Sequence, residues 1–299
     1  MSHGRAVALM VLATLMWSIA GVVSRFLESA RPFEVTFWRS AFNAAALLVV
    51  LLWLRGGRGL VQALRNGGWP LWVSGLCWMT MFTNFMLAIT MTSVASVLVI
   101  MASTPLVTAL FSRLFLGHRL PTRTWAAIVL AGCGIAWMFA LDAAGGEGSY
   151  LGVLVAAGVP LAAATNWTLL QWVHQHRTSA SEPEMLPAVW IGALLSALLM
   201  LPMSLPFAAS AHDIQLLALL GVVQLCIPCL LAVHLAKWLP APELALLGLL
   251  EVILGVLWTW IWAGETPAHH ALTGGALVIA ALVGNELLGL RRAQVAATN

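Results

Sequence analysis

The sequence predicts an all-α, polytopic membrane protein with about ten transmembrane helices. Of its 299 residues, 61% are hydrophobic and only 8% are charged, and the mean hydropathy is +0.94. Soluble domains carry about 25% charged residues. So little charge cannot cover a water-exposed surface, whereas the hydrocarbon of a bilayer needs no such cover. The composition therefore indicates a chain made almost entirely of membrane spans and short loops.

Apolar runs bounded by charged residues, glycine and proline mark the expected spans. A helix needs about 20 apolar residues to cross the hydrocarbon, and ten runs approach that length. They cover residues 6–24, 33–54, 69–90, 93–116, 124–141, 150–172, 185–206, 214–238, 244–263 and 272–290. The third and fourth runs are separated only by the short polar stretch around residues 90–93.

The positive charges predict the orientation of the chain. With the N-terminus in the cytoplasm, all but three of the 14 Lys and Arg residues lie at cytoplasmic span ends. The exceptions, Arg25, Arg31 and Arg39, surround the first external loop. Cytoplasmic loops of membrane proteins carry an excess of Lys and Arg. We therefore expect both termini in the cytoplasm and the protein in the bacterial inner (plasma) membrane.

A weak internal repeat divides the spans into two groups of five. The register shift that superposes Thr104 on Glu251 also superposes Leu116-Gly117-His118 on Ala263-Gly264-Glu265. Residues 1–145 and 146–299 then hold five spans each. Because five is an odd number, the second half enters the membrane from the opposite side. Inverted repeats of this kind surround a binding site near the bilayer midplane, so we expect a central cavity.

The fifth and tenth spans carry small residues four positions apart, which let helices approach closely. These residues are Gly132, Ala136 and Ala140 in the fifth span, and Ala276, Ala280 and Gly284 in the tenth. The two faces are interpreted either as packing within one chain or as the seam of a homodimer.

Polar and aromatic side chains at mid-depth are the candidates for substrate binding, because polar groups there are costly and usually face a cavity or another helix. Rings supply apolar area and a face for cations, while amides and hydroxyls orient a carboxylate or an amine. This combination suits a small zwitterion with an apolar side chain, although single tryptophans also fill gaps between helices. The candidate residues are Trp17, Ser18, Trp78, Thr83, Asn84, Met101, Thr104, Asn166, Trp167, Gln224 and Glu251.

Glu251 is the only carboxylate placed about halfway through a span. An unpaired carboxylate there would cost several kcal/mol or would be protonated. Glu251 is therefore interpreted as a proton carrier, as the partner of a substrate ammonium, or as a neutral side chain hydrogen-bonded to a neighbouring helix.

The remaining motifs argue against other classes of protein. The four cysteines lie in apolar stretches, which disfavours a disulfide framework or a zinc site. Cys226 and Cys229 match C-x-x-C without the context of a redox fold and are interpreted as packing residues. A net charge of +3 does not indicate nucleic-acid binding. We expect no metal and no cofactor.

Three functions remain for a membrane protein of this kind. A carrier for small metabolites is favoured. A lipid-modifying enzyme would need acidic, His or Ser residues clustered at the membrane surface, and none are visible in the sequence. A channel would favour rings of charge or carbonyl-rich loops, and neither is visible in the sequence. The sequence also has no nucleotide-binding motif, so a carrier of this kind would not be driven by its own ATP hydrolysis. A broad-range permease or a channel-like uniporter stays as the alternative to the carrier.

Short motifs resemble those of the drug/metabolite transporter superfamily, specifically its EamA-type exporters. They are Trp17-Ser18 with Arg25, Pro32 with Trp38-Arg39-Ser40-Ala41, Thr104-Pro105 with Leu116-Gly117-His118-Arg119-Leu120, and Gly264-Glu265. Two positions depart from the pattern: His118 stands where an acidic residue is usual, and Val252 replaces a proline after Glu251.

The resemblance implies a central cavity lined by spans one, three, four, six, eight and nine, with spans five and ten peripheral. It also implies a transporter rather than an enzyme. The length and the Trp-rich central helices are similar to those of bacterial amino-acid exporters, including exporters of aromatic amino acids. The expected function is export of small metabolites, foremost aromatic or other apolar amino acids, by alternating access.

Overall fold

The computed structural model describes residues 1–91, 94–117, 120–145, 150–176, 184–263 and 269–298. Four residues of the family motifs lie outside the described residues: His118, Arg119, Gly264 and Glu265. The helices are α1 (His3–Ser24), α2 (Pro32–Asn66), α3 (Gly68–Met91), α4 (Val94–Met101), α5 (Thr104–Leu116), α6 (Thr122–Gly145), α7 (Tyr150–His176), α8 (Leu186–Ser204), α9 (Ala211–Leu219), the π-helix η1 (Leu220–Cys226), α10 (Ile227–Leu235), α11 (Ala241–Gly248), α12 (Leu250–Ala263) and α13 (His269–Thr298).

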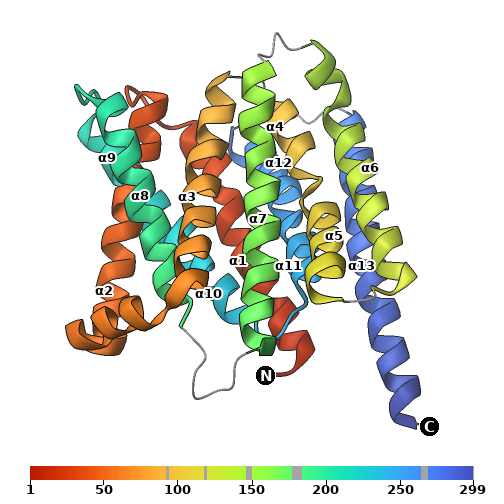
Figure 1. The fold of residues 1–299 in the computed structure, drawn as a ribbon. Helices are drawn as coiled ribbons and strands as arrows, with labels where there is room; N and C mark the ends of the chain where they lie inside the picture. The colour runs from red at the N-terminus through yellow and green to blue at the C-terminus, as the bar shows by residue number, and fades with distance from the viewer. Residues whose placement is uncertain (92–93, 118–119, 146–149, 177–183, 264–268, 299) are drawn as a thin grey trace.

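The helices form the polytopic bundle that the sequence predicts. Within the described residues, eight helical segments are long and apolar enough to cross a membrane. Three of the ten expected spans consist of consecutive pieces: α4 with α5, α9 with η1 and α10, and α11 with α12. The fifth and tenth spans correspond to α6 and α13. Figure 1 shows α7 running from the upper end of the bundle to the lower, opposite to α1, and both termini at the lower end.

The second span differs from its expected end at residue 54. Helix α2 continues to Asn66 and bends at Gly56, whose φ of +66° lies in the left-handed region that glycine adopts without strain. Beyond the bend, residues 57–66 turn across the lower end of the bundle (Figure 1). Leu60 is buried there, whereas Arg58 and Arg65 are exposed. A short amphipathic surface helix therefore stands where a loop was expected. Its apolar face packs against the protein and its charged face is exposed.

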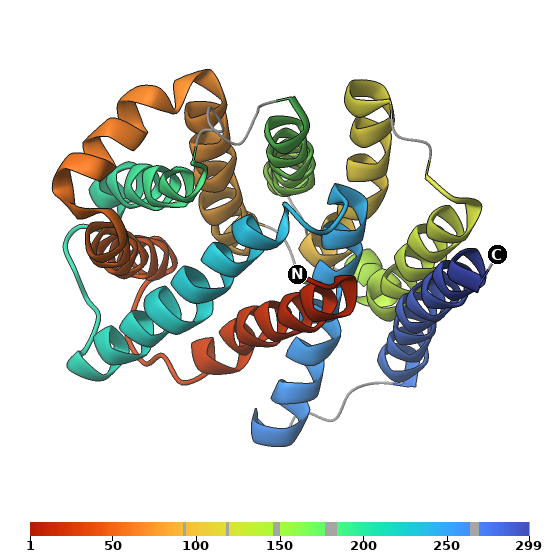
Figure 2. The same ribbon diagram turned by 90° about the horizontal axis from the view of Figure 1, so that it is seen from below.

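Helices α6 and α13 pair at one edge of the bundle, opposite the pair α2 and α8 (Figure 2). The peripheral position expected for spans five and ten is thus observed. A Cβ atom on Gly134 would lie 2.8 Å from the carbonyl oxygen of Gly274, so the two helices touch through their backbones at this glycine. The small-residue faces do not form this seam: no atom lies within 4 Å of a Cβ built on Gly132 or Gly284, and Ala280 is exposed. A homodimer through these faces stays a prediction.

The buried apolar side chains form two main cores. The larger core contains residues of α1, α2, α3, α7, α8, η1, α10 and α11, such as Met10 and Trp78. The smaller core contains residues of α5, α6, α11, α12 and α13, such as Ile135 and Val252. Each core takes helices from both halves of the chain, so the halves are interleaved rather than packed as separate units.

Two buried carboxylates join loops at one end of the bundle. Asp213, at the start of α9, accepts hydrogen bonds from the backbone N–H groups of Glu28 (2.8 Å), Ser29 (3.0 Å) and Ala30 (3.0 Å). Glu34, at the start of α2, accepts bonds from the backbone of Ala208 and Ala209 in the α8–α9 loop. Through these hydrogen bonds the two carboxylates hold the α1–α2 loop against the α8–α9 loop.

We expect Asp213→Ala to destabilise the protein by about 3 kcal/mol, because charge-assisted hydrogen bonds to three backbone N–H groups are lost together. Thermal unfolding of the purified protein in detergent micelles measures the effect as a lower melting temperature. The exposed neighbour provides the control, since His212→Ala removes a side chain without a buried partner. Equal melting temperatures for the two variants would show that the loop contacts contribute nothing to stability.

Candidate functional site

A cavity of about 160 Å³ lies at the meeting of the two cores. Met10, Trp78 and Trp167 reach it from the larger core, and Leu249 and Val252 from the smaller one. A single water needs roughly 10–15 Å³ of such volume, so the space suffices for a small organic molecule. Its walls come from both halves of the chain, as the central cavity of an inverted repeat requires.

Aromatic rings form much of the cavity wall. Trp78 of α3 packs edge to face against Trp167 of α7, with ring centroids 5.6 Å apart, and against Phe82 one turn further along α3 at 5.5 Å. A Cβ on Gly192 would lie 2.3 Å from the Cβ of Trp78, so α8 contacts α3 directly behind this residue. The close contact fixes the base of Trp78 and leaves its ring on the cavity side.

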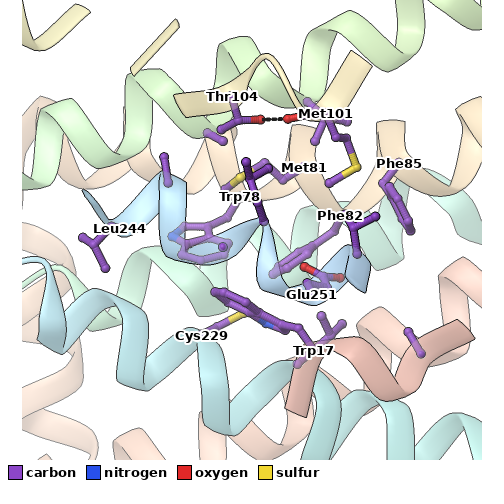
Figure 3. A pocket seen from close by; sticks show the side chains of 18 of the residues that line it. Trp17, Trp78, Met81, Phe82, Phe85, Met101, Thr104, Cys229, Leu244 and Glu251 are labelled. Carbon is purple, nitrogen blue, oxygen red and sulfur yellow. Dashed lines mark hydrogen bonds between the residues drawn. The ribbon is translucent and has the colours of Figure 1, made fainter. Parts of the chain in front are cut away.

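Seven of the eleven predicted site residues line this cavity: Trp17, Trp78, Met101, Thr104, Trp167, Gln224 and Glu251. They come from six different spans, and all six are spans expected to line the cavity. Figure 3 shows the side chain of Glu251 among the aromatic rings of Trp17, Trp78 and Phe82.

The other four predicted residues lie outside the cavity lining and connect helices by hydrogen bonds. Ser18 accepts a bond from the indole of Trp258 (2.8 Å), which joins α1 to α12. Thr83 donates to Ser196 of α8 (2.9 Å). Asn84 donates to the carbonyl of Val155 (3.1 Å) and Asn166 accepts from Ser74 (2.6 Å), so both join α3 to α7. Their polar groups hold the walls together, and their assignment to substrate binding stays a prediction.

The fourth and ninth spans are interrupted where they face the cavity. The break between α4 and α5 precedes Pro105, which lacks the N–H that would bond the carbonyl of Met101. The hydroxyl of Thr104 donates to that carbonyl instead, at 2.6 Å (Figure 3). The break between α11 and α12 falls at Leu249 and places Glu251 in the first turn of α12. This second break forms without a proline, whereas the break between α4 and α5 precedes Pro105.

The eighth span contains a π-helix, η1, beside the cavity. Gln224 of η1 donates to the carbonyl of Trp17 (3.1 Å), and its other amide atom, Oε1, is buried without a partner among the described residues. Pro228 follows at the start of α10. Cys226 and Cys229 both belong to the larger core, and Cys229 also lines the cavity. Cysteine 229, expected to serve packing alone, therefore also forms part of the wall.

Arg39 is the main cavity residue that the sequence did not indicate. The charge pattern placed it at the first external loop, but it lies two turns into α2, is only 5% exposed, and lines the cavity. Its Nε atom is buried without a hydrogen-bond partner among the described residues. Its charge interacts with that of Glu251. An arginine seven residues after Pro32, inside an apolar run, is the signal that could have identified it.

A close contact between α2 and η1 positions Arg39. A Cβ on Gly221 would lie 2.6 Å from the Cβ of Phe42, 2.8 Å from the carbonyl oxygen of Arg39 and 2.9 Å from the backbone nitrogen of Asn43. Only a glycine permits this approach. The contact brings the backbone of Arg39 against the span that also carries Gln224.

Comparison with known proteins identifies the family. The sequence profile of the EamA-like transporter family matches residues 4–140 and again residues 150–285. The chain belongs to the EamA-like transporter family. A pseudopaline exporter, CntI, from Pseudomonas aeruginosa strain UCBPP-PA14 is 24% identical over 278 residues, covering 93% of this chain and 94% of the exporter. The same exporter from the PAO1 strain is also 24% identical over 278 residues.

A solved crystal structure shares the fold, with a TM-score of 0.78 over 96% of this chain and 99% of that chain, at 18% sequence identity. As an EamA-like protein, the chain is a multi-pass membrane transporter and not an enzyme. The family resemblance seen in the short sequence motifs is thus confirmed.

We expect Gly221→Ala to reduce transport strongly, because the added methyl group would force α2 away from η1 and displace Arg39. Uptake into proteoliposomes measures the effect. Gly21→Ala in α1 is the matched control, since no atom lies within 4 Å of a Cβ at that position. Unchanged transport by Gly221→Ala would show that the α2–η1 contact does not maintain the cavity.

Proposed function

We propose that this EamA-like transporter is a secondary carrier that exports small metabolites, foremost aromatic or other apolar amino acids, by alternating access. The observation that carries the proposal is the mid-depth cavity, which combines aromatic walls with two residues of opposite charge, Arg39 and Glu251. Apolar walls favour an apolar side chain, while buried charges favour a ligand with charged groups of its own.

Alternating access is supported by the two cores. The cavity lies between them, so a movement of one core relative to the other would open it toward one side of the membrane or the other. The helix breaks before Thr104 and at Leu249 border the same cavity, and interrupted helices are common at the sites of carriers. Outward transport is supported by the similarity to a protein named an exporter.

We place the protein in the bacterial inner (plasma) membrane with both termini in the cytoplasm. The lower end of the bundle in Figure 1 holds both termini and the exposed arginines of the surface helix, Arg58 and Arg65. The excess of positive charge at this end supports a cytoplasmic location. The outward small-residue faces of α6 and α13 would accept a second copy, which supports the proposed homodimer.

Coupling to protons through Glu251 is a second candidate function of the same site. The carboxylate is partly exposed to the cavity and has no hydrogen bond to a described residue. It can therefore hold either a proton or a substrate ammonium, but not both. Competition for one carboxylate would make the carrier an antiporter of protons and substrate.

The carrier is tested by counterflow of radiolabelled amino acids in proteoliposomes. We expect saturable, trans-stimulated uptake by the wild type, and at least a roughly tenfold loss for Glu251→Gln, which removes a charge worth well over 1.4 kcal/mol of binding. Trp17→Ala should lose transport as well, because its ring forms part of the cavity wall. Trp53→Ala is the matched control, since that tryptophan is 83% exposed at the far end of its span.

Non-saturable flux would identify a channel-like uniporter instead. No flux with any amino acid or related small metabolite would contradict the proposed function.

The pH gradient tests proton coupling. With the lumen more acidic than the outside, protons leaving the liposome should drive the labelled amino acid inward beyond its equilibrium level. A protonophore should abolish this accumulation while leaving counterflow intact, because counterflow needs no gradient. Accumulation that does not respond to the pH gradient would limit Glu251 to binding the substrate.

A further inference from the structure

Arg39 lines the cavity and carries a buried hydrogen-bond donor without a partner among the described residues. Its side chain is nine-tenths buried or more, and its Nε–H has no partner among the described residues. Buried polar groups are normally hydrogen-bonded, and an unsatisfied one requires an explanation. Two further cavity residues carry buried polar atoms without partners, Trp78 (Nε1) and Gln224 (Oε1). The polar groups on this side of the cavity are therefore not fully satisfied by the described residues.

The charges of Arg39 and Glu251 interact, but neither residue takes part in an ion pair between described residues. They approach the cavity from different halves of the chain, Arg39 on α2 and Glu251 on α12. A guanidinium binds a carboxylate through a planar fork of donors. A carboxylate in turn accepts hydrogen bonds from an ammonium.

The balance of charge determines which ligand fits. With both residues ionised, the cavity carries no net charge. A zwitterion leaves this net charge at zero, and each of its charged groups pairs with the protein residue of opposite charge. A substrate that carries only an amine or only a carboxylate would leave one protein charge unpaired and the cavity with a net charge. In a low-dielectric interior such a charge is strongly unfavourable.

We propose that Arg39 binds the carboxylate and Glu251 the ammonium of a zwitterionic substrate, whose apolar side chain lies against the aromatic wall of Trp17, Trp78 and Trp167. This inference rests on the proposed function and specifies the substrate class of the same cavity. It assigns to Arg39 the selection of substrates that carry a carboxylate. The thioethers of Met81 and Met101 on the same wall adapt their shape, which permits side chains of different size.

Three compounds that share the same aromatic side chain test the assignment. They are L-phenylalanine, phenethylamine, which lacks the carboxylate, and 3-phenylpropanoate, which lacks the amine. Each competes with radiolabelled phenylalanine in counterflow and is also titrated against the tryptophan fluorescence of the purified protein. For the wild type, we expect phenylalanine to bind at least about tenfold more tightly than either analogue, since each analogue lacks one charge-assisted contact.

The two single variants should change this preference in opposite ways. Arg39→Gln should lose the preference for phenylalanine over phenethylamine and keep it over 3-phenylpropanoate. Glu251→Gln should do the reverse. Arg58→Gln is the matched control because it removes an exposed arginine of the surface helix, and it should keep the wild-type order. If Arg39→Gln does not fold, Arg39→Lys retains the positive charge and should keep the preference with weaker binding of phenylalanine, because the fork is lost.

A purely structural role predicts other results. If Arg39 only neutralises Glu251, Arg39→Gln weakens all three compounds equally and the double variant R39Q/E251Q restores all three, which would overturn the inference. Equal affinities of the wild type for the three compounds, with counterflow present, would also overturn it and leave the carrier function intact. Preferential binding of phenylalanine without counterflow would support the inference and contradict the carrier function. Absence of both binding and counterflow would overturn both.

Discussion

The hydrocarbon of a membrane offers no hydrogen-bond partners, so the polar side chains of the bundle depend on partners within the protein or in its cavity. Ser18, Thr83 and Asn84 find partners on neighbouring helices and hold α1, α3, α7, α8 and α12 together. Arg39 and Gln224 instead keep polar atoms without partners at the cavity. Each unsatisfied group costs free energy in the empty protein. The same cost would favour a ligand or water that brings the missing partners, which supports the proposed preference for a substrate with charged groups.

The two interrupted spans show how one repeat unit can hold different chemistry in its two copies. At the break in the fourth span, the hydroxyl of Thr104 satisfies the carbonyl of Met101 that Pro105 leaves free. The hydroxyl of Thr104 therefore replaces the missing backbone donor, and its hydrogen is already used in a bond within the protein. At the corresponding position of the ninth span stands Glu251, whose carboxylate is not needed by the backbone and faces the cavity. At this pair of corresponding positions, the second half thus supplies a charged side chain, whereas the first half supplies a neutral one.

The sequence predicted the spans, and most of the predicted site residues line the cavity, because apolar runs and the depth of a residue within a run can be read directly from the sequence. Which side of a helix faces the cavity depends on the rotation of the helix and on its neighbours. Trp17 and Ser18 are adjacent in sequence, yet Trp17 lines the cavity and Ser18 bonds to Trp258. Arg39 was misplaced because the charge rule counts arginines by their distance from a span end and not by their burial. The bend at Gly56 and the π-helix η1 depend on backbone angles that a hydropathy pattern does not contain.

The interleaving of the halves has a consequence for how such a carrier can move. If each half formed its own core, the cavity would lie between two separate five-helix units. Here each core contains helices from both halves. Individual hydrogen bonds, such as that between Ser18 and Trp258, also join one half to the other. Arg39 belongs to a helix of the larger core, whereas Glu251 adjoins Val252 of the smaller one. A change in the separation of the cores would therefore change the distance between the two charges. A zwitterion that contacts both would stabilise the arrangement in which they are close, which couples binding to the position of the cores.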